Sequence, residues 1–289
     1  MKTDTYLDKL VISKGNLTDD FKFPKRLITP NFLLEEAMSK RVAIVTGAAS
    51  GIGKAIAKAL ARNNVKVIIA DLDDDGGKIV AESIGGYFVL TDLSQRIDCQ
   101  TLVDYTLTHH DRIDILVNNA GFQHVNPIEK FPEDTWEKML SVMLTAPFLL
   151  TKYVWPIMKK NSWGRIVNIA SIHSRVASPF KSGYVTAKHG LIGLTRTAAL
   201  EGGAYGITVN ALCPAYVQTP LVENQIAEQT IIHDLSKQEV IKQVMLEPAA
   251  IKRLISPEEV AALVVFLCSE TASAITGSDW AIDLGWTAR

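Results

Sequence analysis

Cysteine is scarce in this sequence. The chain has 289 residues and three cysteines, Cys99, Cys213 and Cys268, which lie far apart and show no CxxC spacing. A sparse, odd set of this kind argues against a disulfide framework and against a zinc site. The histidines also lack the spacing of metal ligands, so we expect no bound metal. So few cysteines fit the reducing conditions of the cytoplasm, where we expect the protein to act.

The sequence also lacks a net charge of either sign and a long hydrophobic run. Its 30 Lys and Arg residues nearly balance 31 Asp and Glu residues, so bulk charge indicates neither a nucleic-acid partner nor a membrane partner. An apolar run such as 261–268 is far shorter than the ~20 residues that span a bilayer. Residues 1–20 have early acidic side chains and no apolar segment, which argues against a secretory signal.

Residues 1–37 differ from the rest of the chain. They are polar, mixed in charge and interrupted by Pro24 and Pro30. We interpret them as an N-terminal extension. It is either a poorly packed tail or early alternative start, or an arm that docks on the body or on a neighbouring subunit. A regular pattern begins after it, and we predict that residues 38–289 form one domain.

From residue 40 the chain alternates short β-branched runs with segments of helical length. Runs that are apolar throughout indicate strands buried on both faces. Their alternation with helices predicts right-handed βαβ units, and hence an α/β fold with a single Rossmann-type doubly wound parallel sheet of about seven strands. The expected strands lie within 41–47, 65–71, 86–92, 113–121, 164–171, 206–214 and 277–283.

One segment interrupts this alternation. Residues 216–256 are helical and amphipathic in places and contain no expected strand. They follow the sixth strand, and ligands of open α/β sheets bind beyond the carboxyl ends of the strands. We therefore predict that this segment is a helical lid over the substrate.

A glycine cluster follows the first expected strand. Gly47, Gly51 and Gly53 lie between this strand and a helix. Glycines there permit a tight turn and a close backbone approach to a pyrophosphate at the N-terminus of the helix. The position of the cluster at the first βα junction predicts a dinucleotide site.

The second strand ends in an acidic residue. Asp71 follows Gly51 by twenty residues, where a carboxylate can accept hydrogen bonds from an adenosine ribose diol and would repel a 2′-phosphate. This position favours NAD over NADP, although a solvated turn aspartate is the alternative. The asparagines of "NNAG" (118–121) follow the fourth strand, where they either tie neighbouring loops together or form an ordinary turn.

Tyr184 and Lys188 lie one helical turn apart and form a possible acid–base pair. An ammonium group close to a phenol favours the phenolate, which can accept the proton of an alcohol. Ser171 lies thirteen residues earlier and can hydrogen-bond the reacting oxygen. A pair on an exposed helix would have no such role, so the interpretation depends on the dinucleotide site nearby.

Together these motifs resemble those of the short-chain dehydrogenase/reductase family. "TGAASGIG" (46–53), "NNAG" (118–121) and "YVTAK" (184–188) match, in order, its motifs TGxxxGxG, NNAG and YxxxK. The resemblance covers about residues 38–289 and implies an NAD-dependent oxidoreductase that forms a homotetramer. Carried over residue by residue, it implies catalysis by Ser171, Tyr184 and Lys188. The implied cofactor contacts are Gly47, Ser50, Gly51, Ile52, Gly53, Asp71, Asp92, Leu93, Asn119, Ala120, Gly121, Tyr184, Lys188, Pro214, Val217 and Thr219.

Three segments are similar to one subgroup of that family, the 3-hydroxybutyrate dehydrogenases of ketone body metabolism. They are "GFQHVNPIEKFP", "IHSRVASPFKSGYVTAKHGLIGLT" and the C-terminal "GWTAR". The similarity implies that a carboxylate substrate, (R)-3-hydroxybutyrate or acetoacetate, is held beside the catalytic residues. The implied substrate contacts are Gln123, Ser171, His173, Lys181, Tyr184, Gln225 and Trp286. Arg175, also in this stretch, is assigned no role.

The sequence departs from the family pattern at Met143. The family usually has an asparagine there, in a pattern like "VNLTAPF", which distorts the helix and holds a water in a proton relay to the lysine. Methionine cannot donate a hydrogen bond, so either backbone carbonyls and water rebuild the relay or activity falls. Two alternatives therefore stay open. One is a dehydrogenase acting on another hydroxy acid, a sugar alcohol or a 3-oxoacyl substrate, and the other is a catalytically weak NAD-binding sensor or scaffold.

Overall fold

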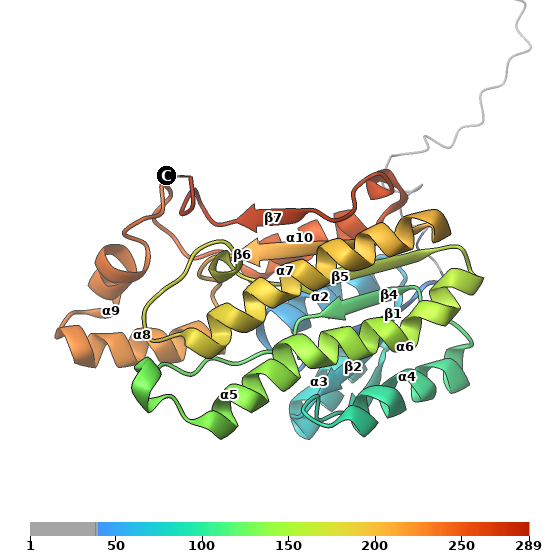
Figure 1. The fold of residues 1–289 in the computed structure, drawn as a ribbon, viewed down its shortest axis with the longest axis horizontal. Coiled ribbons are helices and arrows are strands. Elements are labelled where there is room, and N and C mark those ends of the chain that lie inside the picture. The colour runs from blue at the N-terminus through green and yellow to red at the C-terminus, as the bar shows by residue number, and fades with distance from the viewer. Residues whose placement is uncertain (1–37, 39, 289) are drawn as a thin grey trace, which may run out of the picture.

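The computed structural model of the protein describes residue 38 and residues 40–288. The predicted extension, residues 1–37, lies outside these described residues. The described residues form an α/β fold built around one parallel sheet, shown in Figure 1.

The sheet has seven strands in the order β3-β2-β1-β4-β5-β6-β7, and every neighbouring pair is parallel. Its strands are β1 Val42–Thr46, β2 Lys66–Asp71, β3 Tyr87–Leu90, β4 Ile115–Asn118, β5 Gly164–Ile169, β6 Ile207–Pro214 and β7 Asp279–Ile282. The order reverses between β1 and β4, and such a switch point opens a crevice at the carboxyl ends of the two strands. The predicted doubly wound parallel sheet is confirmed.

Helices cover both faces of the sheet, which explains the uninterrupted apolar strands. All of β1 is buried; Ile44 packs into the core on the side of α4, α6 and α7, and Val45 packs on the side of α2 and α10. Each such buried side chain contributes roughly 1.5–3 kcal/mol to stability. The flanking helices are α2 Gly51–Arg62, α3 Asp74–Ile84, α4 Arg96–His110, α5 Glu133–Leu140, α6 Ala146–Lys160, α7 Ser182–Gly202 and α10 Pro257–Cys268.

A π-helical turn, η2 (Ser141–Thr145), joins α5 to α6. Together they form a continuous stretch, Glu133–Lys160, of 28 residues that is long and apolar enough by length and composition to cross a membrane. It is the one such stretch among the described residues. Its apolar side chains, however, pack against the sheet, and Met139, Met143 and Leu150 are almost fully buried. We interpret it as a core helix.

Residues 216–256 carry helices α8 (Pro220–His233) and α9 (Lys237–Glu239), followed by a π-helical turn η5 (Val240–Met245). They lie at the end of the molecule towards which the strand arrows point in Figure 1. Val222, Ile226, Val240 and Met245 give this segment a small core of its own. Val217 and Ile255 pair at its base as a parallel bridge. The segment is helical and lies at the carboxyl end of the sheet, where the sequence predicts a lid.

Candidate active site

The turn between β1 and α2 requires glycine at several positions. Gly47 has a φ of +62°, and a Cβ there would lie 2.7 Å from the Cα of Ala120. A Cβ on Gly53 would lie 2.2 Å from the carbonyl oxygen of Gly47. Neither contact is sterically possible, so the glycines let the turn close against the loop after β4. The side chain of Ser50 at the N-cap of α2 makes no capping bond, which leaves the first amides of this helix available to an anion.

Asp71 stands at the end of β2 beside this turn. Its Oδ2 accepts from the backbone N–H of Ala49 at 2.9 Å, and its Oδ1 accepts from that of Asp73 at 3.0 Å. The two bonds hold the carboxylate at the edge of the crevice, where a ribose diol would meet it.

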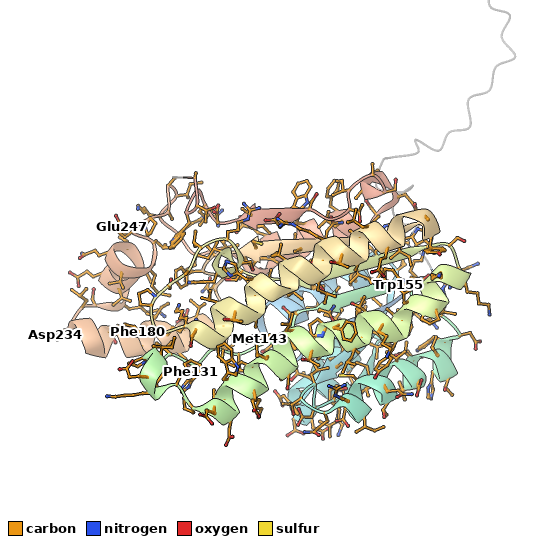
Figure 2. All side chains as sticks on the ribbon, in the orientation of Figure 1. Phe131, Met143, Trp155, Phe180, Asp234 and Glu247 are labelled. Carbon is orange, nitrogen blue, oxygen red and sulfur yellow. The ribbon has the colours of Figure 1, made fainter. Side chains whose placement is uncertain are left out.

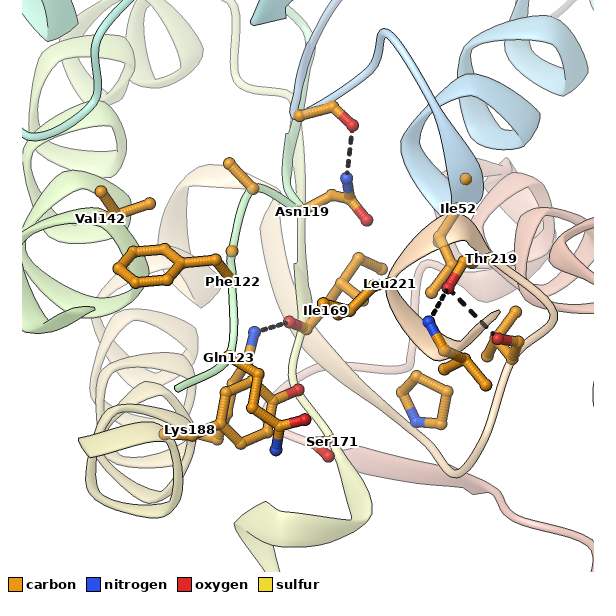
Figure 3. Close-up of a pocket in the computed structure, with 18 of the residues that line it drawn as sticks. Ile52, Asn119, Phe122, Gln123, Val142, Ile169, Ser171, Lys188, Thr219 and Leu221 are labelled. Carbon is orange, nitrogen blue, oxygen red and sulfur yellow. Dashed lines mark hydrogen bonds between the residues drawn. The ribbon is translucent and has the colours of Figure 1, made fainter. Parts of the chain in front are cut away.

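The asparagines of the "NNAG" segment tie strands and loops together. Asn119 Nδ2 donates to the carbonyl oxygens of Thr46 (2.9 Å) and Gly47 (3.0 Å), the second bond being visible in Figure 3. Asn118 Nδ2 donates to Oδ1 of Asn168 on β5 at 2.8 Å. Of the two interpretations left open by the sequence, the structure shows the tie between loops.

Lys188 and Tyr184 lie on α7 below the crevice. Lys188 Nζ donates to the carbonyl oxygen of Ile169 at 2.7 Å, as Figure 3 shows, and lies 5.6 Å from the centre of the Tyr184 ring. Burial lowers the pKa of Lys188 to about 8. Burial also raises the pKa of Tyr184, an effect that a hydrogen bond with Ser171 opposes. The phenol therefore needs nearby positive charge before it can release its proton.

The predicted substrate residues gather around the same phenol. His173 lies with its ring centre 6.0 Å from that of Tyr184, its Nδ1 is 3.4 Å from Ser171 Oγ, and its Nε2 is 2.8 Å from Ser178 Oγ. Burial, aided by the positive charge of Lys181, lowers the pKa of His173 to about 4. The imidazole is therefore neutral near pH 7 and acts through directional hydrogen bonds.

Lys181 is a half-buried cation at the start of α7. Burial alone lowers its pKa, and none of the ion pairs among the described residues includes it. In the lining of the same cavity, Gln225 Nε2 of helix α8 donates to Gln123 Oε1 of the loop after β4. This bond joins the predicted lid to the body of the protein.

One cavity of about 540 Å³ connects the glycine turn to these residues. Figure 3 shows Gln123, Ser171 and Lys188 gathered at one end of it, and Ile52 and Thr219 on another side. The predicted residues that line it are Gly47, Ser50, Gly51, Ile52, Asp71, Leu93, Asn119, Ala120, Gly121, Gln123, Ser171, His173, Lys181, Tyr184, Lys188, Pro214, Val217, Thr219 and Gln225.

Three predicted residues are not brought to this cavity. Gly53 lies beneath the turn, against Gly47. The carboxylate of Asp92 is occupied by Ser94, whose N–H and hydroxyl both donate to it, at 2.9 Å and 2.7 Å. Trp286 lies in the turn after β7, where its backbone N–H donates to the carbonyl oxygen of Asp283.

Tyr216 is a lining residue that the sequence analysis missed. It follows β6 directly, and burial raises the pKa of its hydroxyl. Its position just after a strand could have predicted it, because residues at the carboxyl ends of the neighbouring strands also line the cavity. Phe122, Lys138, Val142 and Leu221 also line the cavity without having been predicted.

Met143 lies in the π-helical turn η2, so this helix is distorted without the asparagine. A Cβ on Gly121 would lie 3.1 Å from the sulfur of Met143 and 3.9 Å from Lys188 Nζ. Met143 and Lys188 therefore both lie beside Gly121. Arg175 points elsewhere and pairs with Asp279 of β7 at 2.9 Å.

Comparison with known proteins supports this architecture. Residues 47–287 match a family model described as enoyl-(acyl carrier protein) reductase. An uncharacterized oxidoreductase of Bacillus subtilis is 46% identical over 87% of this chain and 100% of its own. D-beta-hydroxybutyrate dehydrogenases of Rhizobium meliloti and Cupriavidus necator are 43% and 39% identical, over 86% and 87% of this chain and 99% and 100% of theirs. The chain therefore belongs to the short-chain dehydrogenase/reductase family of oxidoreductases, which use nicotinamide dinucleotides.

Proposed function

We propose that the protein is an NAD-dependent dehydrogenase that interconverts (R)-3-hydroxybutyrate and acetoacetate. Two relatives that are about 40% identical carry the name D-beta-hydroxybutyrate dehydrogenase. The observation that carries the proposal to this chain is the unpaired cation of Lys181 beside Tyr184 and His173.

A charge taken out of water is costly unless a partner compensates it. Lys181 has no carboxylate partner among the described residues, yet it lines the cavity. An anionic substrate would supply that partner. Neutral His173 and the amide of Gln123 would add directional hydrogen bonds, which a carboxylate accepts well.

The arrangement supports alcohol oxidation as follows. Ser171 hydrogen-bonds the substrate hydroxyl and places it against Tyr184, which takes the proton as the carbonyl forms. An oxidised nicotinamide bound in this cavity would supply the hydride acceptor, and before hydride transfer its positive charge would favour the phenolate. Lys188, whose pKa of about 8 leaves it protonated near pH 7, supplies a cation that lowers the cost of forming the phenolate. In the reverse direction Tyr184 returns the proton to the carbonyl oxygen.

The glycine turn and Asp71 fit a dinucleotide without a 2′-phosphate. Gly51 has a φ of +53°, and a Cβ there would lie 3.2 Å from the Thr219 side chain, so glycine lets the turn approach this wall of the cavity closely. We expect kcat/KM with NAD to exceed that with NADP by at least about a hundredfold, because Asp71 would repel a second phosphate. Asp71→Ala should shrink this ratio, and steady-state rates with the two cofactors measure it.

The decisive assay uses purified protein, NAD, and each enantiomer of 3-hydroxybutyrate, with NADH absorbance as the readout. We expect turnover of the (R) enantiomer alone. Turnover of neither enantiomer would overturn the proposal. Activity on a sugar alcohol or a 3-oxoacyl thioester in the same panel would identify another member of the family, and NAD binding without any turnover would identify a sensor or scaffold.

We also propose a homotetramer in the cytoplasm, by analogy with the family. Sedimentation analysis of the full chain tests the assembly directly. The same measurement on a chain that begins at residue 38, compared with the full chain, shows whether residues 1–37 contribute to the assembly.

A further inference from the structure

Phe180, which directly precedes Lys181, has an unfavourable backbone conformation. Its φ is +67°, a value that crowds the Cβ of any residue except glycine and is tolerated mainly by asparagine and aspartate. Among the described residues with positive φ it is the only aromatic one. Its side chain is 57% exposed, so packing of the ring does not explain the conformation.

Backbone contacts on both sides of Phe180 hold this conformation. The carbonyl oxygen of Phe180 accepts from the backbone N–H of Asn126 at 2.8 Å, and the carbonyl oxygen of Lys181 accepts from Val185 in the first turn of α7 at 2.9 Å. Earlier in the same loop, Ser178 is bound to His173 at 2.8 Å. Figure 2 shows Phe180 at the end of the molecule that carries the lid helices.

The bond between Asn126 and Phe180 also connects the two loops that hold the proposed carboxylate contacts. Asn126 lies three residues after Gln123, and Phe180 lies one residue before Lys181. A change of Phe180 to the extended region would turn the following chain in another direction and move the Lys181 ammonium away from the cavity.

We infer that the left-handed turn at Phe180, held by the backbone N–H of Asn126, positions Lys181 to bind the substrate anion. The inference rests on the proposed function. It makes Phe180 a positioning residue that acts through its backbone conformation and not through its ring. Selection for this geometry explains why a strained residue occurs beside a binding lysine.

Substitutions that differ only in their tolerance of positive φ test the inference. Phe180→Gly and Phe180→Asn adopt the left-handed region readily, whereas β-branched Phe180→Val does not. We expect KM for (R)-3-hydroxybutyrate to stay within about twofold of wild type for the first two and to rise by about tenfold or more for Phe180→Val. The Kd of NADH, measured by fluorescence, should be the same in all of them, and kcat should change less than KM.

A second pair addresses the hydrogen bond itself. Asn126→Pro removes the backbone donor, and Asn126→Ala removes the side chain but keeps the donor. We expect a raised KM for Asn126→Pro alone. If Phe180→Val fails to fold, the Asn126 pair still tests the hydrogen bond. The melting temperature of Phe180→Gly still tests the backbone strain, and we expect it to rise by a few degrees.

Equal increases in KM for Phe180→Gly and Phe180→Val would overturn the inference, because the ring would then be the important part. An unchanged KM for Phe180→Val would overturn it as well. Calorimetry of acetoacetate binding to the complex with NAD separates these failures from failure of the proposed function. If wild-type protein binds acetoacetate but the Phe180 variants behave unexpectedly, only the positioning inference fails. If wild-type protein binds no carboxylate, the inference and the proposed function both fail.

Discussion

At the scale of single residues, the sequence predicted candidate reacting groups but not their environment. Tyr184, Lys188 and Ser171 are recognisable from spacing alone. Burial, which lowers the pKa of Lys188 and Lys181 and raises that of Tyr184, depends on segments that are distant in the chain. Tyr216 was not predicted, because it belongs to no sequence motif and only the folded structure brings it to the cavity.

The unpaired cation gives a prediction for Lys181→Ala. We expect KM for (R)-3-hydroxybutyrate to rise about 10- to 100-fold with a smaller effect on kcat, because a charge-assisted bond to the carboxylate is worth ~1.5–3 kcal/mol. Steady-state kinetics measure it. The exposed Lys130, outside the cavity, provides a matched control, and Lys130→Ala should leave KM unchanged. A similar KM for both variants would remove the basis for carboxylate recognition.

Met143→Asn tests whether a proton relay is impaired. Asparagine at position 143, which like Lys188 lies beside Gly121, could bind a water that methionine cannot. We expect kcat to rise on the order of tenfold if that relay limits the rate. The variant should unfold more easily, since Met143 is 1% exposed and a buried amide costs ~1–3 kcal/mol unless bonded. An unchanged kcat would show that proton transfer to Lys188 does not depend on an asparagine in η2.

At the scale of elements, the predicted strands were placed correctly but extended too far. The run 113–121 yields a strand only over Ile115–Asn118. The following Asn119 leaves the ladder because its side chain binds Thr46 and Gly47 instead. Polar residues that serve a neighbouring loop therefore end a strand earlier than apolar periodicity indicates.

A capping box fixes the start of α10, where the predicted lid rejoins the body. Ser256 Oγ accepts from the N–H of Glu259 at 3.3 Å, and Glu259 Oε2 accepts from the N–H of Ser256 at 2.8 Å. Ser256→Ala should lower the free energy of unfolding by about 1 kcal/mol without altering KM, whereas Ser256→Thr should retain most of the stability. Urea denaturation measures both, and a large change in KM would mean that this cap also sets the position of the lid.

At the scale of the whole molecule, His173 links stability to pH. Its pKa is about 4 in the folded protein against an ordinary 6.5, so below pH 6.5 the unfolded chain binds a proton that the folded chain does not. Stability from this residue is therefore complete above pH 6.5 and falls by up to about 3 kcal/mol as the pH drops to about 4.

Urea unfolding at pH 7 and pH 4.5 tests this linkage. The variant His173→Gln should lose less stability between the two pH values than wild type does. A matched change, His109→Gln, at the exposed His109, which is not among the groups that shift the pKa of His173, should leave the loss of stability between the two pH values as in wild type. An equal loss of unfolding free energy between pH 7 and pH 4.5 in wild type and in His173→Gln would show that His173 does not contribute to the acid sensitivity.

The sequence by itself determined the fold class and the family, and it predicted candidate reacting residues, because these depend on local periodicity and on motifs within a few residues. Tertiary structure alone decided which distant groups meet. Gln123 and Gln225 are joined although 102 residues separate them. The carbonyl oxygen of Phe180, a residue with positive φ, accepts from the N–H of Asn126, and Trp286 is left outside the cavity. Such contacts follow from how strands and loops pack in three dimensions, which residue spacing along the chain does not encode.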